Sequence, residues 1–398
     1  MAATAGTLAA PTVRTGGIGG LGAPATASAA PSPPTGFHPL SPTRILDTRT
    51  VNGGGALGPN VARKVPVAGL GGVPPTGATA VVLNLTATQA STQTYLTVFP
   101  SGSPPTASNL NVPAGRDAAN LVTVQLASDG SVQLYNAQGT VHAIFDVFGY
   151  YDDGSVSGAS HFAGLTPARI LDTRLTNSLG PGATQKVQVE GEGGVPLTHV
   201  GAVVMNVTGV SPTAGTYLAV FPSGSPPTAS NVNLQPGEVR PNLVTVPVAS
   251  DGSVEVYNAQ GNTDVVLDVD GYFDDGTVAT NKGFNALAPS RILDTRTTGS
   301  PLGPHAQRTV QVAGNGGVPP AGAAAVVLNV TATQASTGTF LTVYPQAPVP
   351  TTSNLNVPPA TDIPNLVVAT LASNGTVQLY NDQGTVDAIF DVVGWFGP

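Results

Sequence analysis

The chain has 398 residues, only 9% of them charged, with a formal net charge of −8 and no cysteine. This composition excludes a basic nucleic-acid groove, disulfides, thiolate catalysis and cysteine-ligated zinc, as well as a coiled coil, which needs many charged residues. No run of about 20 apolar residues occurs, so the sequence predicts no membrane span.

The first 35 residues form a lead that differs in kind from the rest of the chain. It consists mostly of Ala, Thr, Gly and Pro, and Arg14 is its one charged residue. Such a composition cannot bury a core, so we predict a flexible lead over residues 1–35. The small residues at Ala23–Ala29 suit signal-peptidase cleavage, so a truncated leader is the alternative.

One unit recurs three times in the remaining sequence. The string Arg-Ile-Leu-Asp-Thr-Arg begins at Arg44, Arg169 and Arg291, at spacings of 125 and 122 residues. A period of this length is that of a whole domain, whereas solenoid and propeller repeats run about 20–50 residues. The sequence therefore predicts homologous repeats at 36–151, 161–273 and 284–398, joined by short polar linkers.

Within each repeat, the hydrophobic pattern is that of strands. Thr94–Phe99 alternates and is rich in β-branched and aromatic residues, as half-buried strands are. Leu121–Ala127 and Val132–Tyr135 flank Asp129-Gly130, which predicts a β-hairpin. We expect an all-β fold of three tandem, antiparallel β-sandwich or barrel-like domains, with roughly seven to ten strands each.

A carboxylate recurs in the closing strand of each repeat. Ile144, Asp146 and Phe148 share one face by alternation, and both faces of this strand are apolar, so the strand is predicted to be central. A buried carboxylate needs a partner, and Arg44 or Arg49 of the first strand can hold it through two hydrogen bonds. We predict an architectural polar cluster, with a ligand or metal site as the alternative. The cluster comprises Arg44, Asp47, Arg49 and Asp146; Arg169, Asp172, Arg174 and Asp268; and Arg291, Asp294, Arg296 and Asp391.

Paired carboxylates follow the first two repeats, at Asp152-Asp153 and Asp274-Asp275. We interpret them as solvated acidic turns, since calcium needs six to eight oxygen ligands and only two are visible at each place. A weak calcium site at these linkers is the alternative, and no other cofactor is predicted.

Asparagines and aromatic residues also recur at equivalent positions. Asn84, Asn206 and Asn329 begin Asn-x-Thr strings inside strands, where we expect them to bond neighbouring strands instead of carrying glycans. Ser-Asn-x-Asn strings after Pro-rich turns are expected to lock loops, with sugar binding as a secondary interpretation. In the aromatic endings Tyr150-Tyr151, Tyr272-Phe273 and Trp395-Phe396, we expect one ring in the core and one at the rim, with a carbohydrate platform as the alternative.

No catalytic motif recurs at equivalent positions of the three repeats. The five His residues occupy no common place, and neither a nucleophile elbow nor a zinc-protease motif occurs, so we predict that the chain is not an enzyme.

The recurring strings, from Arg-Ile-Leu-Asp-Thr-Arg to the closing Asp-Val-x-Gly-Tyr-Tyr, resemble a tandem-repeat module of exported actinobacterial proteins. This resemblance covers residues 37–398 and implies a secreted or cell-surface accessory module without catalytic residues. We predict a structural or adhesive array that acts as a spacer or surface-display module; the alternative is a carbohydrate- or cell-wall-binding module. Its expected partners are cell-wall or extracellular polysaccharide or other surface proteins.

Overall fold

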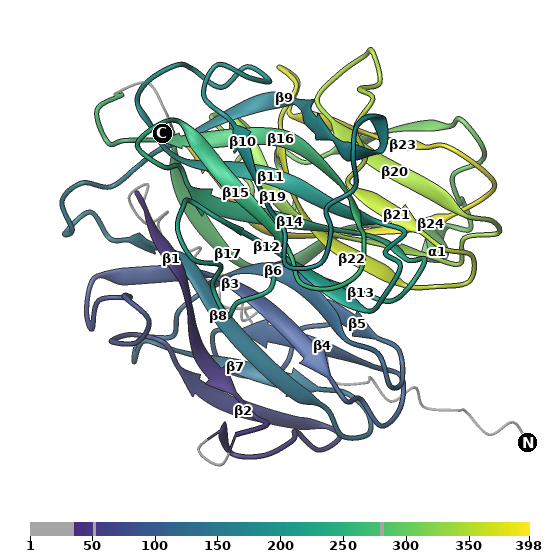
Figure 1. Cartoon of the computed structure of the whole chain (residues 1–398), viewed down its shortest axis with the longest axis horizontal. Helices are drawn as coiled ribbons and strands as arrows, with labels where there is room; N and C mark the ends of the chain where they lie inside the picture. The colour runs from purple at the N-terminus through teal and green to yellow at the C-terminus, as the bar shows by residue number, and fades with distance from the viewer. Residues whose placement is uncertain (1–35, 51–52, 279–281) are drawn as a thin grey trace, which may run out of the picture. The chain divides into compact units, whose positions relative to one another are not determined.

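A computed structural model describes residues 36–50, 53–278 and 282–398, so the prediction for residues 1–35 lies outside the described residues. The all-β prediction is confirmed, because the elements are strands apart from the short turns η2 (Thr173–Leu175) and α1 (Thr295–Thr298) (Figure 1). Among these described residues, no helix has the length and hydropathy that crossing a membrane requires.

Each repeat contains eight strands in one order. The first repeat has β1 (Phe37–Asp47), β2 (Val61–Pro66), β3 (Ala78–Thr88), β4 (Thr94–Phe99), β5 (Leu110–Val112), β6 (Ala118–Gln125), β7 (Ser131–Asn136) and β8 (His142–Asp152). The second has β9 (Phe162–Asp172), β10 (Thr184–Gln188), β11 (Val200–Val210), β12 (Thr216–Phe221), β13 (Val232–Leu234), β14 (Val239–Pro247), β15 (Ser253–Asn258) and β16 (Asp264–Asp274). The third has β17 (Gly283–Asp294), β18 (Gln307–Gln311), β19 (Ala325–Thr333), β20 (Thr339–Tyr344), β21 (Leu355–Val357), β22 (Ile363–Thr370), β23 (Thr376–Asn381) and β24 (Asp387–Gly397).

These strands form six four-stranded antiparallel sheets, two in each repeat. In the first repeat the orders are β1-β8-β3-β6, which we call the inner sheet, and β2-β7-β4-β5, the outer sheet. The inner sheets of the other repeats are β9-β16-β11-β14 and β17-β24-β19-β22, and the outer sheets are β10-β15-β12-β13 and β18-β23-β20-β21. Figure 1 shows the strands of the first repeat, β1 to β8, together in the lower part of the view.

The prediction of a β-hairpin around Asp129-Gly130 is wrong, because the two flanking strands do not pair with each other. The turn exists, with the amide of Gly130 donating to the Ala127 carbonyl at 2.8 Å. However, β6 pairs with β3, whereas β7 pairs with β2 and β4. The turn therefore carries the chain from the inner to the outer sheet. Local sequence specifies the turn, but long-range apolar packing decides which strands pair.

Four hydrophobic clusters hold the sheets together. Three of them each fill the space between the two sheets of one repeat. The fourth draws on the other face of all three inner sheets and includes Val82, Val204 and Val327 at equivalent positions. The described residues all belong to one compact unit, so the expectation of three domains is not matched. The reason is that the inner sheets are apolar on both faces, and each repeat covers only one of them.

Asp270 interrupts this shared cluster. It occupies the place of Phe148 and Val393, both of which belong to the cluster. Asp270 is 2% exposed, and neither carboxylate oxygen has a hydrogen-bond partner among the described residues. Burial, with the nearby charge of Asp268 adding to it, raises the pKa of Asp270 well above its usual value. Burial therefore favours the neutral form of this carboxyl.

Asp270→Val should stabilise the fold by roughly 1–3 kcal/mol, the usual cost of a buried polar group without a partner. Because the folded-state pKa is raised, ionisation of this carboxyl costs no stability below its unfolded pKa, and stability then falls as pH rises toward the folded pKa. Thermal melts from about pH 3 to pH 8 should show the advantage of the variant growing with pH. A difference that is absent, or independent of pH, would contradict this assignment.

Candidate functional site

The recurring carboxylates form buried ion pairs with the first arginine of the repeated string. Asp146 on β8 is 0% exposed and lies directly across from Arg44 on β1. Arg44 Nε donates to Asp146 Oδ1 at 2.8 Å, and its Nη2 donates to Oδ2 at 3.1 Å. The Nε–Oδ1 distances are also 2.8 Å for Arg169–Asp268 and Arg291–Asp391. Each repeat therefore contains a two-point guanidinium–carboxylate contact.

Burial is the main influence on these carboxylates. It raises the pKa of Asp146 and Asp268 above the usual value, and the hydrogen bonds from Arg44 and Arg169 oppose the shift. The hydrogen bonds from the arginine thus offset part of the free-energy cost of burying the charged carboxylate, as in buried ion pairs generally.

The second arginine of the string has a different partner. Arg49 Nε and Nη2 donate to the two carboxylate oxygens of Asp47 at 2.9 and 2.7 Å, and this contact lowers the pKa of Asp47. Arg174 and Arg296 hold Asp172 and Asp294 in the same way. A register shift after Arg44 breaks strict alternation, which brings its Nη1 to 3.6 Å from Asp47 Oδ2. The structure therefore brings all four residues of each predicted cluster together.

The buried pair continues into a contact with the next repeat. Asn84 on β3 lies across from Asp146, which completes a row of Arg44, Asp146 and Asn84 over three strands. Arg44 Nη2 donates to the Thr228 carbonyl at 3.0 Å, and Asn84 Nδ2 donates to the Ser230 carbonyl at 2.5 Å. The expected partner was a neighbouring strand; the strongest contact is instead to the neighbouring repeat.

These contacts run in a cycle. Asn206 Nδ2 donates to the Ser353 carbonyl at 2.6 Å, and Asn329 Nδ2 donates to the Ser108 carbonyl at 2.7 Å. The first repeat thus binds the second, the second binds the third, and the third binds the first.

A second set of asparagines closes a ring. Asn120, Asn242 and Asn365 begin the three Asn-Leu-Val strings and are at most 1% exposed. Their Oδ1 atoms accept from the backbone amides of Leu366, Leu121 and Leu243, respectively, at 3.1, 2.9 and 3.1 Å. Their Nδ2 atoms donate to Oδ1 of Asn329, Asn84 and Asn206 at 3.1, 2.9 and 2.8 Å. We call Asn120, Asn242 and Asn365 the asparagine ring; its spacing was visible in the sequence, but its partners were not.

Aromatic side chains form a second cycle between repeats. Phe37 stacks on Phe273 at 4.3 Å between ring centroids, Phe162 on Phe396 at 4.2 Å, and Phe284 on Tyr151 at 4.2 Å. Tyr151, Phe273 and Phe396 are at most 3% exposed. The second ring of each aromatic ending is therefore in the shared core, as expected. The first ring is at the rim only for Tyr272, because Tyr150 and Trp395 are buried in the cores of their own repeats. These endings do not form the carbohydrate platform that was the alternative.

The acidic pairs are not simple solvated turns. Asp152 is 0% exposed and accepts from the Gly36 amide at 3.1 Å and contacts His38 Nε2 at 2.8 Å. Asp274 is also 0% exposed and accepts from the His161 amide at 3.0 Å. Only Asp153 and Asp275, which cap the turns after them, fit the expectation. No group of three metal-ligating side chains occurs in the described parts of the chain.

The outer sheets carry a repeated aromatic pair that the sequence analysis missed. The ring centroids of Tyr95 and Tyr135 are 6.1 Å apart, those of Tyr217 and Tyr257 are 5.9 Å apart, and those of Phe340 and Tyr380 are 6.0 Å apart. All six are partly exposed, Tyr95 most clearly at 37%. Asn111, Asn233 and Asn356 lie across from the first ring of each pair. Strand alternation on β4 and β7 contains the signal that would have revealed this row.

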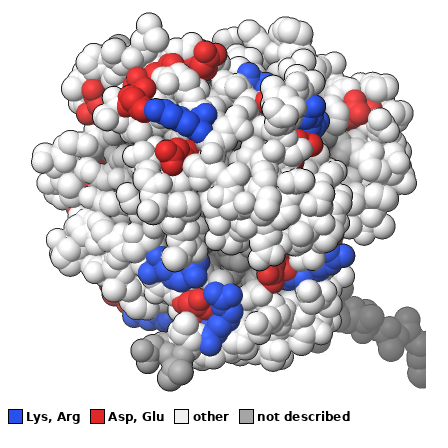
Figure 2. All heavy atoms as spheres, viewed as in Figure 1, with Lys and Arg blue, Asp and Glu red and all other residues white. Residues whose placement is uncertain are grey.

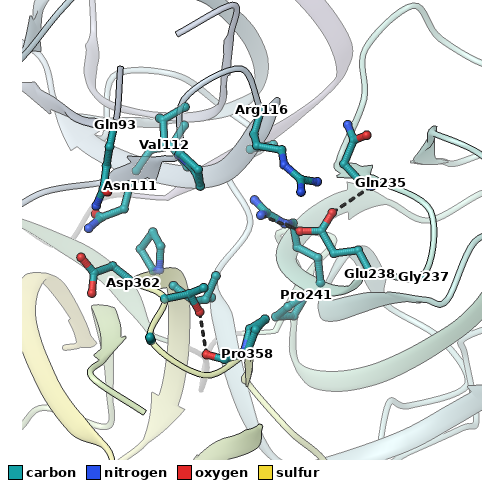
Figure 3. Close-up of a pocket in the computed structure, with 18 of the residues that line it drawn as sticks. Gln93, Asn111, Val112, Arg116, Gln235, Gly237, Glu238, Pro241, Pro358 and Asp362 are labelled. Atoms are coloured by element: carbon teal, nitrogen blue, oxygen red, sulfur yellow. Dashed lines mark hydrogen bonds and ion pairs between the residues drawn. The ribbon is translucent and has the colours of Figure 1, made fainter. Parts of the chain in front are cut away.

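A cavity of about 470 Å³ opens where loops of the three repeats converge. Its wall includes Ala119, Pro241 and Pro364, the residues immediately before the asparagine ring. Figure 3 shows Arg116 and Glu238 on one side, with Gln93, Asn111 and Asp362 on the other. We call this space the axial cavity. The sequence offered no sign of it, because its residues differ between repeats.

Comparison with known proteins yields little. No family model matches the sequence. No curated protein matches it either. Among solved structures, the chain is similar to a protein of Sulfolobus Turreted Icosahedral Virus, with 10% identity, a TM-score of 0.20 and coverage of 91% of both chains. A second, from an archaeal virus with a triple jelly roll fold, has the same identity and coverage and a TM-score of 0.19. Similarity at these values supports no inference about this chain.

Asp268→Ala should destabilise the whole compact unit by roughly 3 kcal/mol, since it leaves Arg169 with only its 3.4 Å contact to Asp172. This is the low end for a buried pair, because the Arg169 side chain keeps 26% exposure. Urea unfolding should show one transition at lower denaturant. Lys186→Ala, which breaks a surface pair with Asp251, is the control and should change little. An unchanged midpoint for Asp268→Ala would argue against an architectural pair.

Asn242→Ala should destabilise the fold by at least about 3 kcal/mol. It removes the partners of the Leu121 amide, of Asn84 Oδ1 and of the Asn231 carbonyl, all in buried surroundings. Gln138→Ala, which truncates an exposed amide, is the matched control. Differential scanning calorimetry checks both, and a loss no larger than that of the control would show that the ring is dispensable.

Proposed function

We propose that the chain is a non-catalytic structural or adhesive array of three β-sandwich repeats that serves as an extracellular spacer or surface-display module. The observation that carries this proposal is the use of the recurring residues. Both sets of asparagines are buried and bonded to other repeats in a cycle, and the carboxylates of the Arg–Asp pairs are buried and bonded within their own repeat. Residues committed to holding a fold are not free to bind a ligand.

The surface is consistent with such a role. Only 9% of residues are charged, and Figure 2 shows a face with few charged side chains, on which blue and red atoms lie in small mixed groups. A surface of mixed charge lacks the large single-sign field that steers nucleic acid or charged substrates. The extracellular setting rests on the resemblance of the recurring strings to exported actinobacterial modules. Calcium binding at the linkers stays the alternative to acidic turns.

A second candidate function is carbohydrate or cell-wall binding, and the aromatic pairs of the outer sheets favour it. Partly exposed rings with a neighbouring amide suit a sugar, because the rings stack on its apolar face and the amide bonds its hydroxyls. The arrangement recurs in every repeat, so three weak sites on one surface-bound chain would act with avidity.

Pull-down of the full chain on peptidoglycan, chitin and cellulose tests both candidates. A structural array should stay in solution at all three. A binding module should be retained on at least one, and the triple variant Tyr95→Ala, Tyr217→Ala, Phe340→Ala should then release it. Retention that survives the triple variant would argue against the aromatic pairs as the binding surface, and any retention would weaken the purely structural proposal.

A further inference from the structure

The axial cavity has the size and walls of a ligand site. Its volume of about 470 Å³ lies within the range of small-molecule pockets, roughly 300–1,000 Å³. Pro113, Pro241, Pro358 and Pro364 contribute rigid apolar wall, and Gln93 and Asn111 contribute amides. This mixture of apolar wall and a few polar groups is typical of pockets that orient a compact ligand.

The charges around the cavity do not repeat, although the residues beneath them do. Arg116, Glu238 and Thr361 occupy equivalent places four residues before the asparagine ring. Asparagine-ring closure is the same in all three repeats, so it does not explain why this level carries a cation, an anion and a neutral hydroxyl. Because these three residues differ in charge, the electrostatic potential in the cavity has no threefold symmetry, and a charged ligand would bind in one orientation.

One positive charge at the cavity has no partner. Glu238 Oε1 accepts from Arg240 Nε at 3.0 Å and Nη2 at 2.7 Å, and Glu238 Oε2 accepts from the Gln235 amide at 2.8 Å. Glu238 and Arg240 therefore satisfy each other. Arg116, on the same side in Figure 3, has no side-chain hydrogen bond or ion pair with any described residue. On this side of the cavity, two guanidinium groups therefore face the one carboxylate of Glu238, and the other carboxylate of the wall, Asp362, lies on the opposite side. The Arg116 guanidinium is thus available to a carboxylate of a ligand.

The opposite side of the cavity offers acceptors and amides. Asp362 takes the Thr333 hydroxyl through Oδ1, and Asn111 and Gln93 lie beside it in Figure 3. Such groups bond hydroxyls well and repel a second carboxylate. We propose that the axial cavity binds a monosaccharide-sized sugar acid, with its carboxylate on Arg116 and its hydroxyls toward Asp362, Asn111 and Gln93. This site shares Asn111 with the first outer-sheet aromatic pair but contains neither of its rings, and it does not depend on the role of the pair.

Titration of the full chain with glucuronate, followed by NMR chemical shifts, tests the site, with glucose and acetate as partial probes. We expect saturable glucuronate binding at millimolar concentrations, and binding at least about tenfold weaker for glucose and for acetate. Failure to saturate by about 10 mM glucuronate would overturn the proposal. Acetate as tight as glucuronate would overturn the sugar part, and glucose as tight would overturn the role of the carboxylate.

Two substitutions locate the binding. Arg116→Gln should weaken glucuronate roughly 10- to 100-fold, the usual effect of losing a charge-assisted hydrogen bond. Thr361→Glu, which adds a carboxylate to the cavity wall, should weaken it as well. Lys64→Gln removes the same unit charge from an exposed side chain outside the cavity and should leave the affinity unchanged. Unchanged affinity in both Arg116→Gln and Thr361→Glu, or an equal loss in Lys64→Gln, would overturn the assignment.

Discussion

The structure depends on hydrogen bonds to polar groups that are buried on the inner sheets. Asn84 and Asp146 lie on the face turned away from the core of their own repeat, whereas Asn120 lies across from Leu85, which belongs to that core. A buried amide or carboxylate without a partner is costly, so these groups must be bonded within the protein. Asp146 finds Arg44 inside its repeat, whereas the two asparagines find their partners in other repeats. That division turns three similar units into one compact body.

The hydrogen bonds between repeats form a complete cycle because there are three repeats. Each asparagine of the ring bonds one neighbouring repeat, and the leucine after it donates its backbone amide to the other neighbour. A pair of repeats would therefore leave amides and carbonyls without partners at the break. The stacked pairs Phe37–Phe273, Phe162–Phe396 and Phe284–Tyr151 follow the same cyclic rule. Polar bonds specify the register between repeats, since their geometry is directional, and the aromatic contacts supply apolar burial that is less selective. The unit is therefore expected to unfold as a whole.

Alternation and repeat spacing were enough to predict the strands and the need for an arginine beside Asp146. They could not choose between Arg44 and Arg49, because a bulge after Arg44 changes which residues share a face, and alternation assumes that no bulge occurs. The hairpin at Asp129-Gly130 failed for a related reason: a turn motif reports local geometry, while strand pairing depends on residues far away in the sequence. The partners of Asn84 and Asn120 lie more than 100 residues away, and no pattern within one repeat identifies them.

At some positions the three repeats carry different residues, and the cyclic contacts between repeats do not explain these differences. Phe148 and Val393 are what a shared apolar core selects, and Asp270 at the same place adds a cost without a bond. Arg116, Glu238 and Thr361 differ just outside the asparagine ring, where the packing of the repeats places no such demand. The asparagines that hold the repeats together are the same in all three repeats, whereas these residues around the axial cavity differ. The two groups are therefore under different constraints. The positions that are equivalent in the three repeats stabilise the fold. Residues around the axial cavity can differ without loss of these contacts, so this is the place where a binding function can be added to the fold.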